Sequence, residues 1–159
     1  MTTIHDILDY YRHLSRDELE KGKKFERMIA QFLLTDPEYA NRLSSVWLWE
    51  DWPYRWATNN TGIDLVAQER DSGNYWAIQC KFYDPTTTIK KEHVDSFIAD
   101  ANKVFDVDGQ KRGFSYCLIV STSEKWGKNA EAVTENQTIP VYKLYLNELA
   151  DSPIDWDEF

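Results

Sequence analysis

Residues 114–121 form an almost unbroken apolar run, Phe-Ser-Tyr-Cys-Leu-Ile-Val-Ser, which limits the folds open to this chain. A strand without a polar face must be buried on both sides, and this is typical of a central strand in an α/β protein. Other segments alternate in type along the chain, with helical patterns at 3–16, 19–34, 90–105 and 124–136 and strand patterns at 45–53, 63–69, 75–82 and 139–146. We therefore predict an α/β sandwich with a central mixed β-sheet.

The size of the chain predicts a single domain. With 159 residues, of which 42% are apolar, it can bury one good core. We expect a compact domain over residues 1–150 and an acidic linker over residues 151–159. Four Trp residues lie within residues 47–56, where they could stack on bases or pack against the sheet. We favour packing, because Glu50 and Asp51 add negative charge there.

Residues 63–82 predict a β-hairpin, since two strand-like runs flank a short turn-forming segment. The register that we predict places Asp64 opposite Lys81 and Val66 opposite Gln79. Side chains alternate along a strand, so these groups would share one face of the sheet. An acid, an amide and an amine would then converge.

Such a trio suits the hydrolysis of phosphodiesters. A carboxylate and a neighbouring oxygen ligand can hold a hard divalent cation, which polarises a phosphate and acidifies a water. An ammonium can offset the charge that builds on phosphorus. The alternative is an exposed cross-strand ion pair between Asp64 and Lys81, which is common on hairpins.

Asp64, a fifteen-residue interval and Gln79-Cys80-Lys81 resemble the PD-(D/E)xK nuclease signature in its Mrr-like form, in which Gln replaces the second acid. The segment Gly22-Lys-Lys-Phe-Glu26 is similar to the first-helix motif that supplies an extra acid in that superfamily. Residues 119–130 are similar to the strand and helix that follow the catalytic hairpin. One departure is Ile63, which stands where the signature has proline.

The resemblance implies a restriction-endonuclease-like α/β/α sandwich and a metal-dependent DNA endonuclease without sequence recognition of its own. It implies that Asp64 is the principal metal ligand, with Gln79 and the backbone carbonyl of Cys80 as further ligands. Lys81 would supply electrostatic stabilisation and positioning, and Glu26 would be an outer acid. The implied cofactor is Mg²⁺, for which Mn²⁺ could substitute.

The similarity is greatest to the amino-terminal nuclease domains of type ISP restriction-modification enzymes and related helicases. It implies double-stranded DNA as a partner, and ATP-driven helicase or translocase and methyltransferase domains in the same polypeptide. The net charge of -9 argues against autonomous binding to phosphates, although residues 130–159 hold most of the excess, with one basic and seven acidic residues. Attachment to a motor would replace free encounter with a high local concentration.

Lys90 and Lys91 begin a predicted helix, where the helix dipole favours acids instead. We interpret these lysines as candidate DNA contacts, together with Asn59 in the polar loop that precedes Asp64. A solvated pair of lysines is the alternative.

The chain has no stretch of about 18 apolar residues and no signal-peptide pattern, so we expect a cytoplasmic protein without membrane association. Cys80 and Cys117 lie within predicted strands and lack metal-ligand spacing, which indicates buried thiols.

Two other functions remain open from the sequence. A catalytically inactive module of the same fold would bind DNA or dock a motor without cleavage. An unrelated α/β interaction domain, in which Asp64 and Lys81 form a simple ion pair, would bind no divalent metal.

Overall fold

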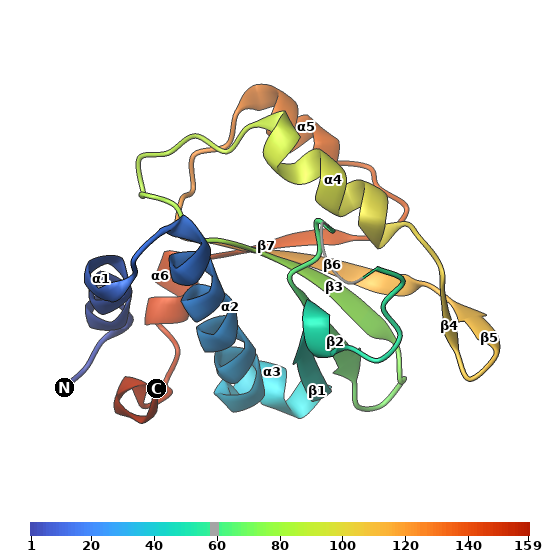
Figure 1. Ribbon diagram of the computed structural model, residues 1–159, viewed down its shortest axis with the longest axis horizontal. Helices are drawn as coiled ribbons and strands as arrows, with labels where there is room; N and C mark the ends of the chain where they lie inside the picture. Colours follow the sequence, from blue (N-terminus) through green and yellow to red (C-terminus); the bar gives the residue numbers. More distant parts are fainter. Residues whose placement is uncertain (58–60) are drawn as a thin grey trace.

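The computed structural model describes residues 1–57 and 61–159 and is built around a five-stranded sheet in the order β1-β2-β3-β6-β7 (Figure 1). The strands are β1 (Leu43–Leu48), β2 (Leu65–Glu69), β3 (Tyr75–Lys81), β6 (Phe114–Ser121) and β7 (Val141–Tyr145). β1, β2 and β3 pair antiparallel, whereas β3, β6 and β7 pair parallel. The sheet is therefore mixed, as predicted.

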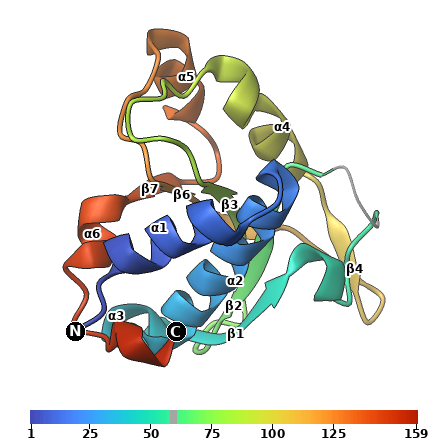
Figure 2. The same ribbon diagram turned by 60° about the vertical axis from the view of Figure 1, so that its left-hand side comes forward.

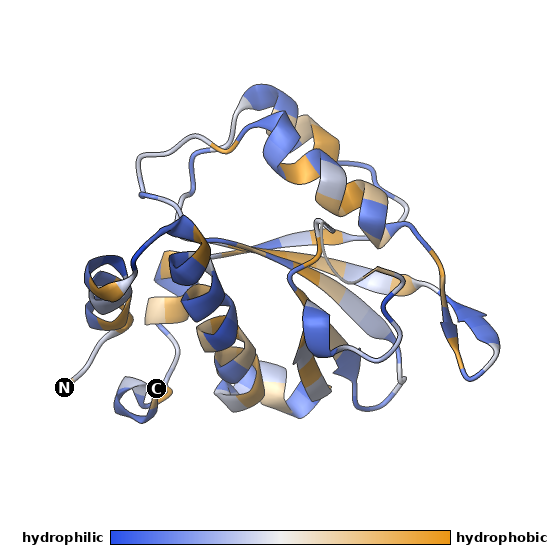
Figure 3. Ribbon diagram, in the orientation of Figure 1, coloured by the Kyte–Doolittle hydropathy of each residue, from blue (hydrophilic) through white to orange (hydrophobic). Residues whose placement is uncertain are grey.

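Helices cover both faces of this sheet, which confirms the α/β/α sandwich (Figures 1 and 2). On one side lie α1 (Ile4–Leu14), α2 (Glu18–Thr35), α3 (Pro37–Arg42) and α6 (Leu146–Ala150), and on the other lie α4 (Lys91–Ala101) and α5 (Lys128–Thr134). Figure 3 shows that α2 and α4 each combine apolar and polar residues, as helices with one buried face do.

β6 is buried on both faces, as its composition predicts. Leu118 and Val120 point into the core under α2, whereas Cys117 and Ile119 point into the core under α4. The period of two along a strand distributes these side chains between the two layers. β6 therefore fixes the middle of the sandwich.

The helices also follow their sequence signals. The Thr3 side chain accepts a hydrogen bond from the Asp6 N–H, and the Asp6 carboxylate accepts one from the Thr3 N–H, which forms a capping box before α1. All members of the apolar stripe predicted for α2 are buried: Phe25, Met28, Ile29, Phe32 and Leu33. The stripe packs α2 onto the sheet, and this contact fixes the rotation of α2 about its own axis.

The structure corrects two predicted boundaries. The helix predicted to end at residue 105 ends at Ala101, and a hairpin of β4 (Phe105–Val107) and β5 (Gln110–Arg112) follows it. Asp108 and Gly109 adopt positive φ values of 51° and 86°, the turn geometry that closes this hairpin.

The Trp-rich strand predicted to reach residue 53 ends at Leu48, where the short helix η1 (Trp49–Asp51) begins. Trp52 is fully buried, with ring centroids 4.7 Å from Phe105 and 5.6 Å from Phe114. Packing, rather than base stacking, therefore accounts for Trp52.

The segment predicted as an acidic linker, residues 151–159, packs against the domain. Trp156 of η2 (Trp156–Glu158) is 6% exposed and stacks on Phe32 with ring centroids 6.0 Å apart. The Thr2 N–H donates to the Asp157 carboxylate at 3.1 Å. Burial of the Trp156 ring outweighs the acidic composition of these residues.

Within residues 1–57 and 61–159, no helix has both the length and the apolar character that crossing a membrane requires. Both cysteines are free; Cys117 is buried and Cys80 is half-buried. Burial raises the pKa of Cys117 to about 12, as expected for a thiol enclosed by apolar side chains.

Candidate active site

β2 and β3 form the predicted hairpin, but with a register that differs by two residues. Val66 pairs with Ala77 instead of Gln79, and continuing this register places Asp64, just before β2, opposite Gln79. The turn lies one residue earlier than predicted, because the Glu69 N–H donates to the Asn74 carbonyl and residues 70–73 instead of 71–74 form the loop. A shift of two residues keeps every side chain on its original face, so the correction leaves the trio on one face.

Main-chain contacts on both sides fix Asp64. Its N–H donates to the Ile78 carbonyl of β3 at 2.9 Å, and its carbonyl accepts from the Trp49 N–H at 2.9 Å. The Oδ2 atom accepts a hydrogen bond of 2.8 Å from the Cys80 N–H. Burial raises the pKa of Asp64 to about 6, although the Cys80 N–H and the Lys81 ammonium both act to lower it.

Gln79 is 6% exposed and carries an unsatisfied acceptor. Its Nε2 atom donates to the Gly62 carbonyl at 3.4 Å, while its Oε1 atom is buried and has no hydrogen-bond partner. Buried side-chain oxygens normally have a partner, so this orphaned atom indicates a missing donor or cation.

Lys81 ends β3 and is 7% exposed. Its Nζ atom lies 3.4 Å from the Tyr83 hydroxyl, and it forms no ion pair within 4.0 Å with any carboxylate of the described residues. Burial lowers the pKa of Lys81 to about 8, against the opposing effect of Asp64. An exposed ion pair between Asp64 and Lys81 is therefore contradicted.

Glu26 approaches the site from α2. Glu26 is 9% exposed, and burial, followed by the charge of Asp64, raises its pKa to about 7. Its Oε1 atom lies 3.9 Å from Lys23 Nζ, which also pairs with Glu50 at 3.0 Å. Glu26 is thus a buried neighbour of Asp64 and not a solvated charge at the edge of a helix.

Glu50 is a neighbour that the sequence analysis missed. Its charge acts on the pKa of both Asp64 and Glu26. Glu50 follows β1, whose last residue Leu48 pairs with Leu65 beside Asp64. The pairing of β1 with β2 was the signal that could have identified it.

These groups suit a hard divalent cation. Carboxylates with raised pKa values and an orphaned amide oxygen are the oxygen donors that Mg²⁺ and Mn²⁺ prefer. Within the described part of the chain, no three His, Cys, Asp or Glu side chains are grouped to hold a metal. A cation here would therefore need the amide oxygen of Gln79, main-chain oxygens and water as further ligands.

The candidate DNA contacts lie on the α4 side. Lys90 is exposed, whereas Lys91 forms an ion pair of 2.8 Å with Asp95. Both lysines line a cavity of about 270 Å³ together with Lys128 at the start of α5. Asn59 lies outside the described residues.

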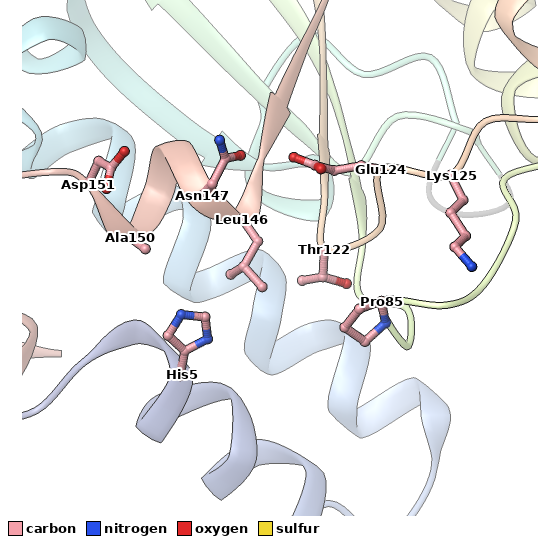
Figure 4. A pocket seen from close by; sticks show the side chains of 9 residues that line it. All are labelled: His5, Pro85, Thr122, Glu124, Lys125, Leu146, Asn147, Ala150 and Asp151. Carbon is pink, nitrogen blue, oxygen red and sulfur yellow. The ribbon is translucent and has the colours of Figure 1, made fainter.

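Another cavity, of about 480 Å³, has none of the candidate catalytic side chains in its lining (Figure 4). It is lined by His5 of α1, Leu146 of α6 and Thr122, among others. The site around Asp64 therefore does not coincide with this cavity.

Comparison with protein families gives one match: the family model Mrr_cat_2, described as restriction endonuclease, matches residues 34–159. The matched range contains the hairpin of Asp64, Gln79 and Lys81 but not Glu26. A search of curated proteins gave no match.

Three solved structures are similar. The ATP-dependent type ISP restriction-modification enzyme LlaBIII bound to DNA has a TM-score of 0.76 and 28% identity over 100% of this chain and 9% of its own. The MspJI restriction endonuclease in complex with a 27-mer oligonucleotide has a TM-score of 0.58 and 18% identity over 92% of this chain and 29% of its own. The DNA modification-dependent restriction endonuclease AspBHI has a TM-score of 0.56 and 15% identity over 92% of this chain and 33% of its own. The chain spans about a tenth of the length of LlaBIII and about a third of the other two.

Proposed function

The chain belongs to the restriction endonuclease family Mrr_cat_2, and from this premise we propose that it hydrolyses phosphodiester bonds of double-stranded DNA at the site around Asp64. We further propose Mg²⁺ as its cofactor, with Mn²⁺ as a substitute. The observation that carries the proposal is the buried, unpartnered Oε1 atom of Gln79 in the strand that binds the Asp64 carboxylate. This oxygen and the carboxylate would hold the cation, together with the backbone carbonyl of Cys80.

A divalent cation supplies Lewis acidity, which polarises a phosphate and acidifies a water. Lys81 then offsets the negative charge that develops on the phosphate oxygens, and its burial strengthens that effect. The Cys80 N–H orients one oxygen of Asp64 and leaves the other free for a ligand. Glu26, with a pKa of about 7, can accept or release a proton near neutral pH as an outer acid.

The same proposal extends to the context of the domain. The similarity to part of LlaBIII supports a place in a larger restriction-modification polypeptide, beside ATP-driven helicase or translocase and methyltransferase domains. Lys90, Lys91 and Asn59 would contact the DNA backbone. The net charge of -9 favours delivery by such a motor over independent binding.

Metal removal and a single substitution test the proposal together. Supercoiled plasmid incubated with this chain and Mg²⁺ or Mn²⁺ should be nicked, and EDTA should stop the reaction because the site then lacks its cation. Lys81→Ala should lower the nicking rate about 100-fold, since it removes a preorganised charge. Gel electrophoresis of the plasmid measures both effects.

Lys111→Ala is the matched control, because Lys111 lies in β5 and is 70% exposed. It should nick at the parent rate. Equal nicking by the parent and Lys81→Ala would contradict the proposed role of Lys81, whereas nicking that EDTA does not stop would indicate a contaminating nuclease. DNA binding without cleavage under either metal would indicate an inactive module of the same fold.

Gln79→Glu tests the proposed ligand set. A second carboxylate beside Asp64 should tighten Mn²⁺ binding about tenfold, because hard cations bind anionic oxygens more strongly than amides. Isothermal titration calorimetry with Mn²⁺ measures the change. An unchanged affinity would remove Gln79 from the ligand set.

A further inference from the structure

Tyr83 lies two residues beyond Lys81, on the segment that leads from β3 to α4. The Lys81 Nζ atom is 3.4 Å from the Tyr83 hydroxyl and 5.5 Å from the centroid of its ring. Lys81 forms no ion pair within the described residues. Its hydrogen-bond partner is instead the uncharged phenol of Tyr83.

Thr122 anchors the main chain on both sides of this contact. The Tyr83 N–H donates to the Thr122 hydroxyl at 2.8 Å, and this hydroxyl donates to the Tyr83 carbonyl. The Thr122 N–H donates to the Lys81 carbonyl at 3.1 Å. Thr122 is 3% exposed, and it extends the pairing of β3 with β6 beyond Lys81 and Ser121.

His93 of α4 lies beside the Tyr83 ring. The ring centroids of Tyr83 and His93 lie 5.5 Å apart, and His93 Nδ1 accepts a hydrogen bond of 2.9 Å from the Lys90 N–H. The phenol is therefore held by its backbone and by a fixed neighbour. A side chain so restrained can orient a flexible one.

We propose that Tyr83, anchored by Thr122, is a positioning residue that holds the Lys81 ammonium in the active site. The inference rests on the proposed function of Lys81. Lysine has a flexible four-carbon stem, and its charge stabilises a transition state best when it is already oriented. The phenol oxygen accepts a hydrogen bond from the ammonium, and the aromatic face attracts the cation.

Plasmid-nicking kinetics with graded substitutions test this role. Tyr83→Leu removes ring and hydroxyl and should lower kcat about tenfold, with KM for the plasmid within twofold of the parent value. Tyr83→Phe keeps the ring and should recover part of that loss, to within about threefold of the parent kcat. Tyr10→Leu is the matched control, because Tyr10 is 61% exposed on α1, and it should leave kcat unchanged.

A double-mutant cycle separates positioning from a general structural effect. If Tyr83 acts through Lys81, Tyr83→Leu should cost nothing further in a Lys81→Ala background, measured under single-turnover conditions. An equal loss of rate from Tyr83→Leu with and without Lys81 would overturn the role of Tyr83 but not that of Lys81. The same holds if Tyr83→Leu has the kcat of the parent while Lys81→Ala is impaired. A parent rate for Lys81→Ala would overturn the proposed role of Lys81 on which it rests.

Discussion

Asp64→Asn should abolish cleavage and yet make the metal-free protein more stable at neutral pH. Cleavage should fall about 10³-fold, because the substitution removes the carboxylate charge that would hold the cation beside the neutral Gln79 amide. Stability should rise because burial raises the pKa of Asp64 to about 6, which means that its charged form opposes folding. The two effects have opposite signs, so poor folding cannot imitate the result.

The pH dependence follows from the direction of this shift. An unfolded Asp has a pKa of about 3.9, so the folded chain binds more protons than the unfolded chain between about pH 4 and pH 6. The free energy of unfolding of the parent therefore falls as pH rises through that window. Asp64→Asn should gain about 1 kcal/mol at pH 7.5, less than the full shift implies because Asp64 is partly exposed, and gain nothing at pH 4.

Urea unfolding in EDTA at both pH values measures the gain, and plasmid nicking with Mg²⁺ measures the loss. Asp106→Asn is the control, since Asp106 is 61% exposed in β4 and should change neither quantity. Cleavage at the parent rate by Asp64→Asn, or a lower urea midpoint at pH 7.5, would contradict the assignment.

Gly62→Ala should be strongly destabilising, because Gly62 has the closest backbone contacts among the glycines. A Cβ atom at this position would lie 2.5 Å from the Phe97 N and 2.7 Å from the Ser96 carbonyl carbon, both of which belong to the backbone of α4. A helix backbone cannot yield as a side chain can, so α4 must move away from the sheet. We expect a loss of about 2–4 kcal/mol in the free energy of unfolding.

Gly62→Ala should also weaken cleavage, since the Gly62 carbonyl accepts the hydrogen bond that orients Gln79. Gly22→Ala is the control of opposite sign: Gly22 lies within α2, and nothing is within 4 Å of the position of its Cβ. It should stabilise by about 0.5–1 kcal/mol, because alanine favours helix. Urea unfolding measures the free energy of unfolding of both variants. A value for Gly62→Ala equal to that of the parent would contradict the predicted clash with α4.

The layered fold was predictable because its signals are local and strong. The apolar run of β6 and the helical stripe of α2 each repeat one pattern over two or more turns or pleats, and both are buried as predicted. The boundary of α4 was less predictable. Val104 and Phe105 continue the helical pattern, but Phe105 lies in the hairpin that the turn at Asp108 and Gly109 closes.

The register of the hairpin between β2 and β3 could not be predicted from the sequence. Two registers that differ by two residues place the same side chains on the same faces, so hydrophobic patterning favours them equally. The turn decides between them, through the hydrogen bond from Glu69 to Asn74 and the positive φ of Gly73. The identity of the groups near Asp64 was therefore easier to predict than their pairing.

Residues that reach the site from distant segments were harder still. Glu50, Tyr83 and Thr122 are separated from Asp64 by strands and loops whose packing no periodicity reveals. The pairing of β1 with β2 places Glu50 near Asp64, and the pairing of β6 with β3 places Thr122 beside Lys81. Only the assembled sheet makes them neighbours.

The hydrogen bond from the Trp49 N–H to the Asp64 carbonyl ties the main chain at Asp64 to the aromatic core. Trp49 itself packs against Trp52 and Trp56, with ring centroids 5.5 Å and 5.0 Å away. We expect a change of volume among these rings to shift the main chain that carries the Asp64 carboxylate. Substitutions in the tryptophan-rich segment should therefore alter the position of the Asp64 carboxylate as well as the packing of the core.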